Sequence, residues 1–336
     1  VKVIPVNDIW TAYKEFTGKD FPRPEARPLP PVSTKMSTHV LKHIPKWAKL
    51  YDSARKKYLS WPEIGRPEFA NQHLALADAS RKKIDRLLQE GQFAPAYWDA
   101  VWSATMAWAA HEVGRYQYTY SLNGQEAAFG LVHKDEWLQK EVDSTSAAMR
   151  FYRPQTFDQL SIYMQACDAF TTGLAYQMLA DVLRSNLPDD PEKASVWVIA
   201  IAQQHTLCWM NMKLARDYLE LADAYEGTPI PPDAPCLELA KFFLRSADAG
   251  MTMVNELEVQ KVAEKYNLSK EVAVAELSLR DSQYALAVIC QNRIFSNLPK
   301  YFGEGKQLEY AMLAAAISLE EVSHRILSAL FRVFPR

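Results

Sequence analysis

The chain has little glycine, with 11 residues in 336, and it has no run in which β-branched and polar residues alternate as in a half-buried strand. Its net charge is only −2, without the basic surplus of a nucleic-acid binder or a polyanionic tail. No apolar run reaches the roughly 18 residues that a membrane span requires, and we recognise no signal peptide. We therefore expect a soluble, cytoplasmic, helical protein with neither nucleic acid nor a membrane as partner.

Sequence patterns for the common chemistries are also missing. No G-x-S-x-G, P-loop or G-x-G-x-x-G pattern occurs, so no motif in the sequence indicates nucleophilic hydrolysis or nucleotide chemistry. The cysteines show no C-x-x-C spacing, and we expect buried thiols in a reducing compartment rather than a metal or redox motif. The four are Cys167, Cys208, Cys236 and Cys290.

Residues 1–46 differ in composition from the remainder of the chain. Five prolines between positions 22 and 31 exclude a regular helix there, while Trp10, Tyr13 and Phe16 supply apolar anchors that a disordered tail would lack. We predict an extended, proline-rich N-terminal arm over 1–46 that wraps its own core or a partner and becomes ordered only in the assembly; a mobile tail is the alternative. Residues 47–336 are predicted to form a single helical-bundle domain.

Apolar residues, which make up 49% of the chain, recur at helical spacing through the second region. Thr156 with Gln159 forms a capping box, Asp190 with Pro191 is a helix start, and Gly91 is a helix end. Eight or nine helices follow, of which four are about 30 residues long, or roughly 45 Å. Helices are expected over about 45–61, 67–91, 96–123, 135–149, 156–186, 190–227, 237–266, 269–297 and 306–334.

The segment 96–123 is predicted to be one long helix, buried nearly all round. Trp98, Trp102 and Trp108 contribute to its apolar surface, and replacing Trp102 or Trp108 by alanine should cost roughly 3–5 kcal/mol if these side chains are in the core. Glu112 is interpreted as a buried acid bonded to a neighbouring tyrosine or arginine. Gly114 weakens a helix, so we expect it to permit close packing against another backbone.

A bundle of long helices raises the question of a di-iron carboxylate site, which needs a Glu from two helices and Glu-x-x-His from two more. Only Glu321 and His324 have that spacing, and we interpret them as an ordinary surface pair. The polar run 203–205 is interpreted as a seam between helices. We therefore predict no catalytic, cofactor-binding or metal-binding residue on this chain.

Two segments nevertheless resemble a known family. The segment AYWDAVWSATMAWAAHEVGRYQYTYS, with Glu112 and Gly114, is similar to the tryptophan-rich helix of the β subunit of the hydroxylase of bacterial multicomponent di-iron monooxygenases. The segment YMQACDAFTTGLAYQMLADVL, with Asp168, resembles a second helix of that family, and the proline-bearing arm also fits. Together they cover about a quarter of the chain, and the region after Pro229 shows no clear likeness.

The resemblance implies an all-α, ferritin-like (ribonucleotide-reductase-like) long-helix bundle with an extended N-terminal arm. It also implies a non-catalytic subunit that scaffolds a metal-bearing α subunit for oxygen-dependent hydroxylation or epoxidation of a hydrocarbon. The di-iron centre would lie in the α subunit, with a small γ subunit completing an α2β2γ2 assembly and a reductase and regulatory protein binding transiently. Two alternatives stay open: a stand-alone di-iron oxygenase using Glu112, Glu321 and His324, and a purely structural helical protein.

Overall fold

The computed structural model describes residues 9–20, 34–132, 136–187 and 190–333. The chain divides into two units, Val1–Thr34 and Lys35–Arg336. The described part of the first unit contains the short helix α1 (Ile9–Thr17), and the predicted proline-rich stretch, 22–31, lies outside the described residues. The second unit holds the remaining helices.

The described residues of the second unit are mostly helical and include no strand, which confirms the all-α class; their one β-bridge is the isolated pair of Thr156 and Pro229. None of the described helices is both long and apolar enough to cross a bilayer. The helices are α2 (Thr34–Leu59), η1 (Glu63–Gly65), α3 (Glu68–Gln89), α4 (Phe93–Val132), α5 (Glu136–Phe151), α6 (Phe157–Ser185), α7 (Pro191–Ala222), α8 (Cys236–Val254), η2 (Asn255–Val259), α9 (Gln260–Tyr266), α10 (Lys270–Arg280), α11 (Ser282–Ile289), η3 (Cys290–Ile294), α12 (Phe295–Phe302) and α13 (Lys306–Val333).

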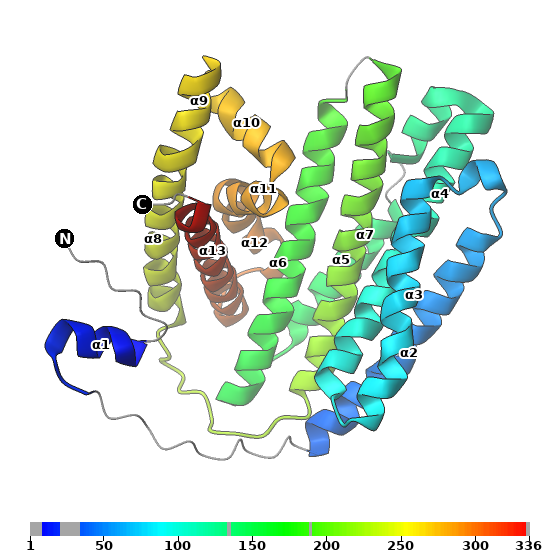
Figure 1. Ribbon diagram of the computed structural model, residues 1–336. Coiled ribbons are helices and arrows are strands. Elements are labelled where there is room, and N and C mark those ends of the chain that lie inside the picture. Colours follow the sequence, from blue (N-terminus) through cyan, green and yellow to red (C-terminus); the bar gives the residue numbers. More distant parts are fainter. Residues whose placement is uncertain (1–8, 21–33, 133–135, 188–189, 334–336) are drawn as a thin grey trace. The chain divides into compact units, whose positions relative to one another are not determined.

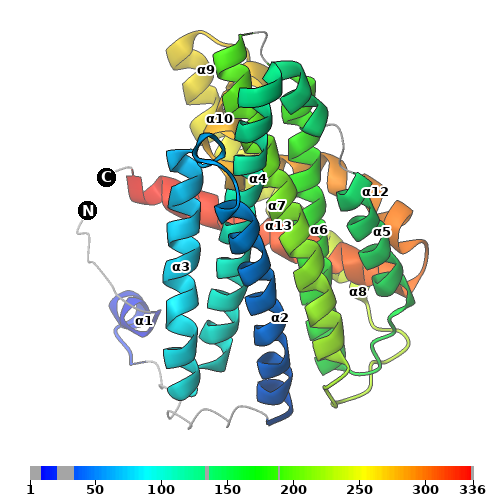
Figure 2. The same ribbon diagram turned by 90° about the vertical axis from the view of Figure 1, so that its right-hand side faces the viewer.

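Helices α6 and α7 pack side by side through the middle of the second unit (Figure 1). The pair α3 and α4 packs on one side of them, mainly through α4 against α7, and the pair α8 and α13 lies on the other. Helix α13 crosses the direction of the other long helices (Figure 2). The bundle therefore has its central helices covered on both sides.

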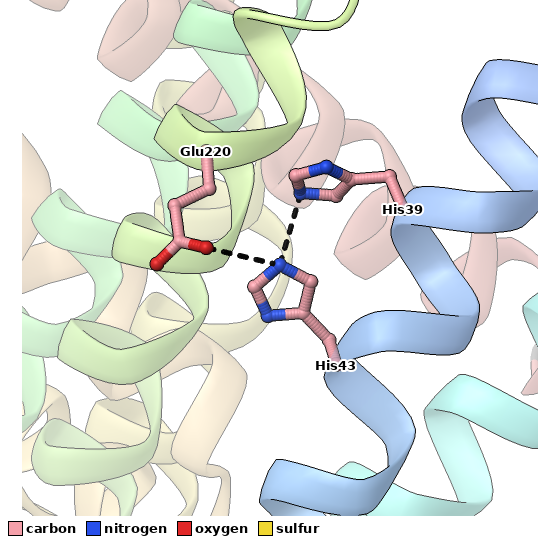
Figure 3. A group of neighbouring side chains, drawn as sticks. All are labelled: His39, His43 and Glu220. Atoms are coloured by element: carbon pink, nitrogen blue, oxygen red, sulfur yellow. Dashed lines mark hydrogen bonds and ion pairs between the residues drawn. The ribbon is translucent and has the colours of Figure 1, made fainter.

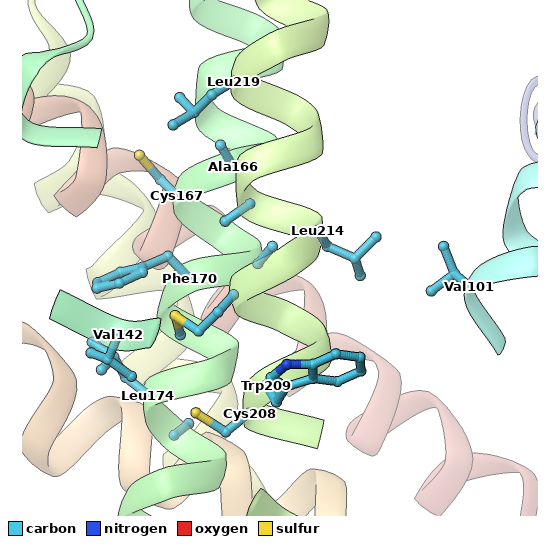
Figure 4. Packing of buried hydrophobic residues seen from close by; sticks show 14 of the residues in the cluster. Val101, Val142, Ala166, Cys167, Phe170, Leu174, Cys208, Trp209, Leu214 and Leu219 are labelled. Carbon is cyan, nitrogen blue, oxygen red and sulfur yellow. The ribbon is translucent and has the colours of Figure 1, made fainter. Parts of the chain in front are cut away.

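Aromatic and aliphatic side chains fill the space between the central helices (Figure 4). The ring of Trp108 on α4 stacks on Trp209 of α7 with centroids 5.2 Å apart, and Trp47 of α2 meets Trp209 edge-on at 6.3 Å. On the opposite side of α6, Phe170 packs edge-on against Tyr301 and Phe302. Such rings remove large apolar areas from water, so they are the main source of cohesion between α2, α4 and α7.

Several predicted helix ends are confirmed. The hydroxyl of Thr156 accepts from the backbone N–H of Gln159 at 3.3 Å, which is one half of the predicted capping box, while Oε1 of Gln159 accepts from the N–H of Gln155 instead of Thr156. Gly91 follows α3 with φ +70°, the left-handed conformation expected after a helix end. Helix α7 begins at Pro191. These ends depend on local chemistry alone, which explains why the sequence predicts them.

Helix α2 begins earlier than predicted. It starts at Thr34, so residues 34–46, assigned to the extended arm, are helical, and the boundary between units falls at Thr34 and Lys35. Pro45 lies inside the helix, where it removes the bond to the carbonyl of Leu41. Both residues are exposed, so water can satisfy that carbonyl. The proline is therefore tolerated instead of ending the helix.

Helix α4 is longer than predicted and not buried all round. It extends to Val132 across a kink at Gly124, which has φ +78°, although the helices predicted over 96–123 and 135–149 leave a gap there. Trp98 and Trp102 are 50% and 44% exposed, so their placement in the core was wrong. The predicted loss of 3–5 kcal/mol therefore does not apply to Trp102. The two residues are four apart, so they occupy one exposed face of the helix.

The two helices expected over 237–266 and 269–297 are each interrupted. A π-helical turn, Asn255–Val259, separates α8 from α9, and another, Cys290–Ile294, separates α11 from α12. Asp281 ends α10 and caps α11 by accepting from the N–H groups of Gln283 and Tyr284. Helix α12 then continues through Pro299 to Phe302. These breaks divide the region into shorter pieces than hydrophobic periodicity indicates.

The free thiols lie in or beside the core. Cys167, Cys208 and Cys236 are buried, as expected, and Cys290 is partly buried. Burial raises the pKa of Cys290 to about 12 and raises the pKa values of Cys167 and Cys236 as well. All three are therefore held as neutral thiols at neutral pH.

Candidate functional site

Glu112 is the buried acid that the sequence predicts. Its Oε2 atom accepts a hydrogen bond from Nη2 of Arg115 at 2.5 Å, one turn along α4. Burial raises the pKa of Glu112, and the adjacent Arg115 opposes that rise. Oε1 lies 3.9 Å from Nε2 of His111, which is too far for a hydrogen bond. The interpretation of Glu112 as an acid paired with a neighbouring arginine is confirmed.

Glu321 and His324 are both exposed on α13 and bind different partners. Glu321 accepts from Arg325 at 2.6 Å, while Nδ1 of His324 lies 3.0 Å from Glu320. Among the described residues, Glu112, Glu321 and His324 do not come together within the span of one ion. The exposure of Glu321 and His324 agrees with their interpretation as ordinary surface residues.

The polar run on α7 is a seam between helices, as predicted. Nε2 of Gln203 lies 3.2 Å from Nε2 of His73 on α3, and Nε2 of His205 lies 3.3 Å from Nη2 of Arg184 on α6. Asp168, singled out by the resemblance, is largely buried on α6. Burial raises its pKa, and a hydrogen bond with Ser318 lowers it.

A different set of side chains converges where α2 faces the last turns of α7 (Figure 3). His39 and His43 are four residues apart on α2, which places both imidazoles on one face of the helix. Their Nε2 atoms are 2.9 Å apart, and Nε2 of His43 is 3.4 Å from Oε2 of Glu220. One ligand atom from each of His39, His43 and Glu220 lies within 4.8 Å of the others. We call these three residues the His–His–Glu cluster.

Asp217 lies behind the cluster, one turn before Glu220 on α7. Its Oδ1 atom is 2.7 Å from Nδ1 of His43, an ion-pair contact whose angle does not suit a hydrogen bond. Its Oδ2 atom accepts from the indole of Trp47 at 2.7 Å and from the hydroxyl of Tyr97 at 2.8 Å. Burial, followed by the charge of Asp217, strongly raises the pKa of Tyr97, so this hydroxyl keeps its proton. Asp217 is therefore held in place by α2 and α4.

The carboxylate of Glu220 also faces two lysines. Nζ of Lys46 lies 3.1 Å from Oε2, and Nζ of Lys42 lies 3.5 Å from the same atom. Burial alone would raise the pKa of Glu220, but Lys46, His43 and Lys42 together hold it below its ordinary value. Burial also lowers the pKa of His39, with the charges of His43 and Lys42 acting in the same direction. A neutral imidazole and an ionised carboxylate are therefore the favoured states of His39 and Glu220.

A cavity of about 110 Å³ adjoins the cluster. His39, His43 and Asp217 border it on the polar side, while Tyr97 and the half-exposed Trp98 border it from α4. A space of this size has room for a few water molecules beside polar partners. A larger hollow of about 440 Å³ is lined from α6, α7, α10, α11 and η3, but its lining is mainly apolar, with Arg293 as its charged residue.

The His–His–Glu cluster was missed by the sequence analysis. The signal was the H-x-x-x-H spacing of His39 and His43, together with Asp217 and Glu220 three apart on a predicted helix. Residues 1–46 were assigned to an extended arm, in which a spacing of four does not align two side chains. The cluster depends on α2 beginning at Thr34.

Comparison with known proteins gave no matching family model, no matching curated protein and no matching solved structure. Functional arguments for this chain therefore rest on its own residues and on the resemblance of its two helical segments.

Proposed function

We propose that the chain is the non-catalytic β subunit of the hydroxylase of a bacterial multicomponent di-iron monooxygenase, with a ferritin-like bundle that scaffolds the catalytic α subunit. In this cytoplasmic complex the di-iron centre belongs to the α subunit, which hydroxylates or epoxidises a hydrocarbon. A small γ subunit completes an α2β2γ2 assembly, and a reductase and a regulatory protein bind transiently.

The exposed tryptophans of α4 carry this proposal. Trp98 and Trp102 lie on successive turns of the helix, and each leaves about half of its surface uncovered. Large aromatic side chains are enriched at the centres of protein interfaces, where they supply most of the binding energy. Two tryptophans on successive turns form one exposed apolar patch, and such patches mark interaction sites when they are large. A partner that covers them would bury both rings.

The inner side of the same helix supports a scaffolding role. Trp108 is stacked on Trp209, and Glu112 is paired with Arg115. The facing positions of α4 and α7 are thus occupied by packed rings and a local ion pair. Closely packed side chains at these positions keep α4 and α7 at a fixed separation. A subunit that positions the four-helix site of a neighbour needs such rigidity.

The experiment is purification of the native complex, with mass-spectrometric identification of every chain that co-purifies. We expect a larger chain with two Glu-x-x-His motifs, carrying about two irons. Changing Trp98 and Trp102 together to serine should abolish this association while leaving the fold intact, because both side chains are half exposed. Leu122→Ser, which changes a residue 58% exposed at the far end of α4, is the matched control and should keep the partner.

The alternatives give different outcomes. Two irons per chain in the isolated protein, with activity lost in Glu321→Ala or His324→Ala, would establish a stand-alone di-iron oxygenase in place of a scaffold. A chain that purifies alone, without iron, would favour a purely structural helical protein. In the proposed complex, both alanine variants should leave hydroxylation nearly unchanged, because each side chain is exposed and pairs only with a neighbour on α13.

A further inference from the structure

We propose that the His–His–Glu cluster binds one divalent transition-metal ion, with Zn²⁺ as the ion that suits it best, and that the ion joins the beginning of α2 to the end of α7. This replaces the expectation that the chain has no metal-binding residue. It is independent of the partner subunit and of any di-iron chemistry.

Two of the three separations between the ligand atoms are close to those of a tetrahedral site, and the third, between His39 and Glu220, is within 4.8 Å. Zinc bonds of roughly 2.0–2.1 Å imply ligand atoms about 3.3 Å apart. The Nε2 atoms of His39 and His43 are 2.9 Å apart, and Nε2 of His43 is 3.4 Å from Oε2 of Glu220. Small rotations of the side chains would therefore bring these three atoms to bonding distance around one ion.

The types of ligand also fit. Two imidazoles and one carboxylate are a common set of protein ligands for zinc, with water in the fourth position. The cavity of about 110 Å³ borders His39 and His43 and could hold that water.

Asp217 supplies the supporting carboxylate that histidine ligands usually have. Its Oδ1 atom is 2.7 Å from Nδ1 of His43, and a small turn of the imidazole would let Nδ1–H donate to it, which would leave the lone pair on Nε2 facing His39 and Glu220. Trp47 and Tyr97 fix Asp217 through two hydrogen bonds. The orientation of His43 is thus set by side chains that bind no metal themselves.

A proton on His39 and the ammonium group of Lys46 compete with the ion for its ligand atoms. Without a metal, Nε2–H of His39 can donate to Nε2 of His43, and the charges of Lys42 and Lys46 balance Glu220. On binding, the proton of His39 moves to its other nitrogen, and Lys46, 3.1 Å from Oε2, moves off that oxygen. The affinity should therefore be limited by Lys46, a feature that nonspecific binding to surface histidines would not share.

The test is titration of the full-length chain, stripped with a chelator, with Zn²⁺ in a calorimeter and with Co²⁺ in a spectrophotometer. We expect one ion per chain and the strong visible absorption of four-coordinate Co²⁺. His39→Ala and Glu220→Gln should each weaken binding at least roughly tenfold, and Asp217→Asn should do so by about 10–100-fold. Lys46→Ala should tighten it by roughly fivefold, the scale of one exposed ion pair.

The matched control is His324→Ala, which removes an exposed histidine next to a carboxylate on α13 and should leave binding unchanged. Circular dichroism must show each variant folded; Glu220 is about half exposed, so Glu220→Gln is the decisive variant. The proposal is overturned if the folded chain binds no Zn²⁺ at micromolar concentration, or if Glu220→Gln and His39→Ala bind it as tightly as the native chain.

Discussion

At the scale of single residues, His111 is a base that its surroundings keep neutral. The indole N–H of Trp61 donates to its Nδ1 atom at 3.1 Å, and the two rings are stacked with centroids 5.8 Å apart. Burial lowers the pKa of His111 to about 4, and the charges of Lys57 and Arg115 act in the same direction. Protonation would both charge a buried ring and remove the acceptor of Trp61.

This depressed pKa predicts a loss of stability in acid. Unfolded, His111 titrates near 6.5, so its contribution is fully present above that pH and is lost as the pH falls toward about 4. At roughly 1.4 kcal/mol per pKa unit, the loss approaches about 3 kcal/mol. The measurement is chemical denaturation of the native chain and of His111→Gln between these pH values.

The native chain should lose stability more steeply than the variant. The raised pKa of Glu112 acts with opposite sign, stabilising the fold as the pH falls, but it is present in both proteins. Parallel stability curves for the two chains over this interval would show that His111 is not held neutral.

Single residues also show how far the sequence predicts a site. Glu112 was predicted because its partner Arg115 lies three positions away on the same helix. The His–His–Glu cluster was not, since it joins α2 to α7 across about 180 positions of chain. Periodicity indicates which residues share one helix face, but it does not indicate which faces of two helices meet.

At the scale of elements, Gly114 is the point where α4 approaches the turn between α2 and α3. A methyl group added there would lie 2.7 Å from the carbonyl oxygen of Gly65 and 3.0 Å from the ring of Tyr58. This confirms the predicted close backbone packing. The carbonyl belongs to η1, a single turn that has little freedom to move away.

Gly114→Ala should therefore destabilise the chain by about 1–3 kcal/mol, despite the better helix propensity of alanine. Gly130→Ala is the matched control on the same helix, because a methyl group there meets nothing within 4 Å, and it should be neutral or stabilising by up to about 1 kcal/mol. Equilibrium unfolding in urea measures both. If both variants proved equally stable, the packing at Gly114 would be looser than the distances indicate.

The elements also divide into those that the sequence predicts and those that it does not. The cap at Thr156 and the helix start at Pro191 depend on local residues and were predicted correctly. The start of α2 was missed because Pro45 was taken as a boundary, although it sits on an exposed face. The π-helical turns at 255–259 and 290–294 left no pattern in the sequence. A π-helical turn contains one residue more than an α-helical turn. Whether a helix takes up this extra residue depends on how it packs on its neighbours, which hydrophobic periodicity does not show.

At the scale of the whole molecule, the described core lies entirely in the second unit. Its three buried clusters contain no residue before Val40. A chain beginning at Lys35 should therefore keep the helical circular dichroism and the cooperative melting of unit 2. If the N-terminal segment serves the assembly, as its apolar anchors predict, the shortened chain should bind the proposed α subunit more weakly.

Co-purification of the shortened and full-length chains with that subunit measures this difference. Equal recovery of the partner with both chains would remove the N-terminal segment from the interface. Loss of cooperative melting in the shortened chain would instead show that this segment belongs to the core.

The buried thiols can report on local opening of the native protein. A thiol reacts with an alkylating reagent only as an exposed thiolate, and burial keeps Cys167, Cys236 and Cys290 protonated. Cys167 and Cys236, which are buried, therefore react only when their own part of the bundle opens, while the partly buried Cys290 is protected mainly by its raised pKa. Cys167 and Cys208 report on the junction of α6 and α7, Cys236 on the start of α8, and Cys290 on a π-helical turn. Their separate alkylation rates would map the free energy of local opening along the native chain, with no foreign label required.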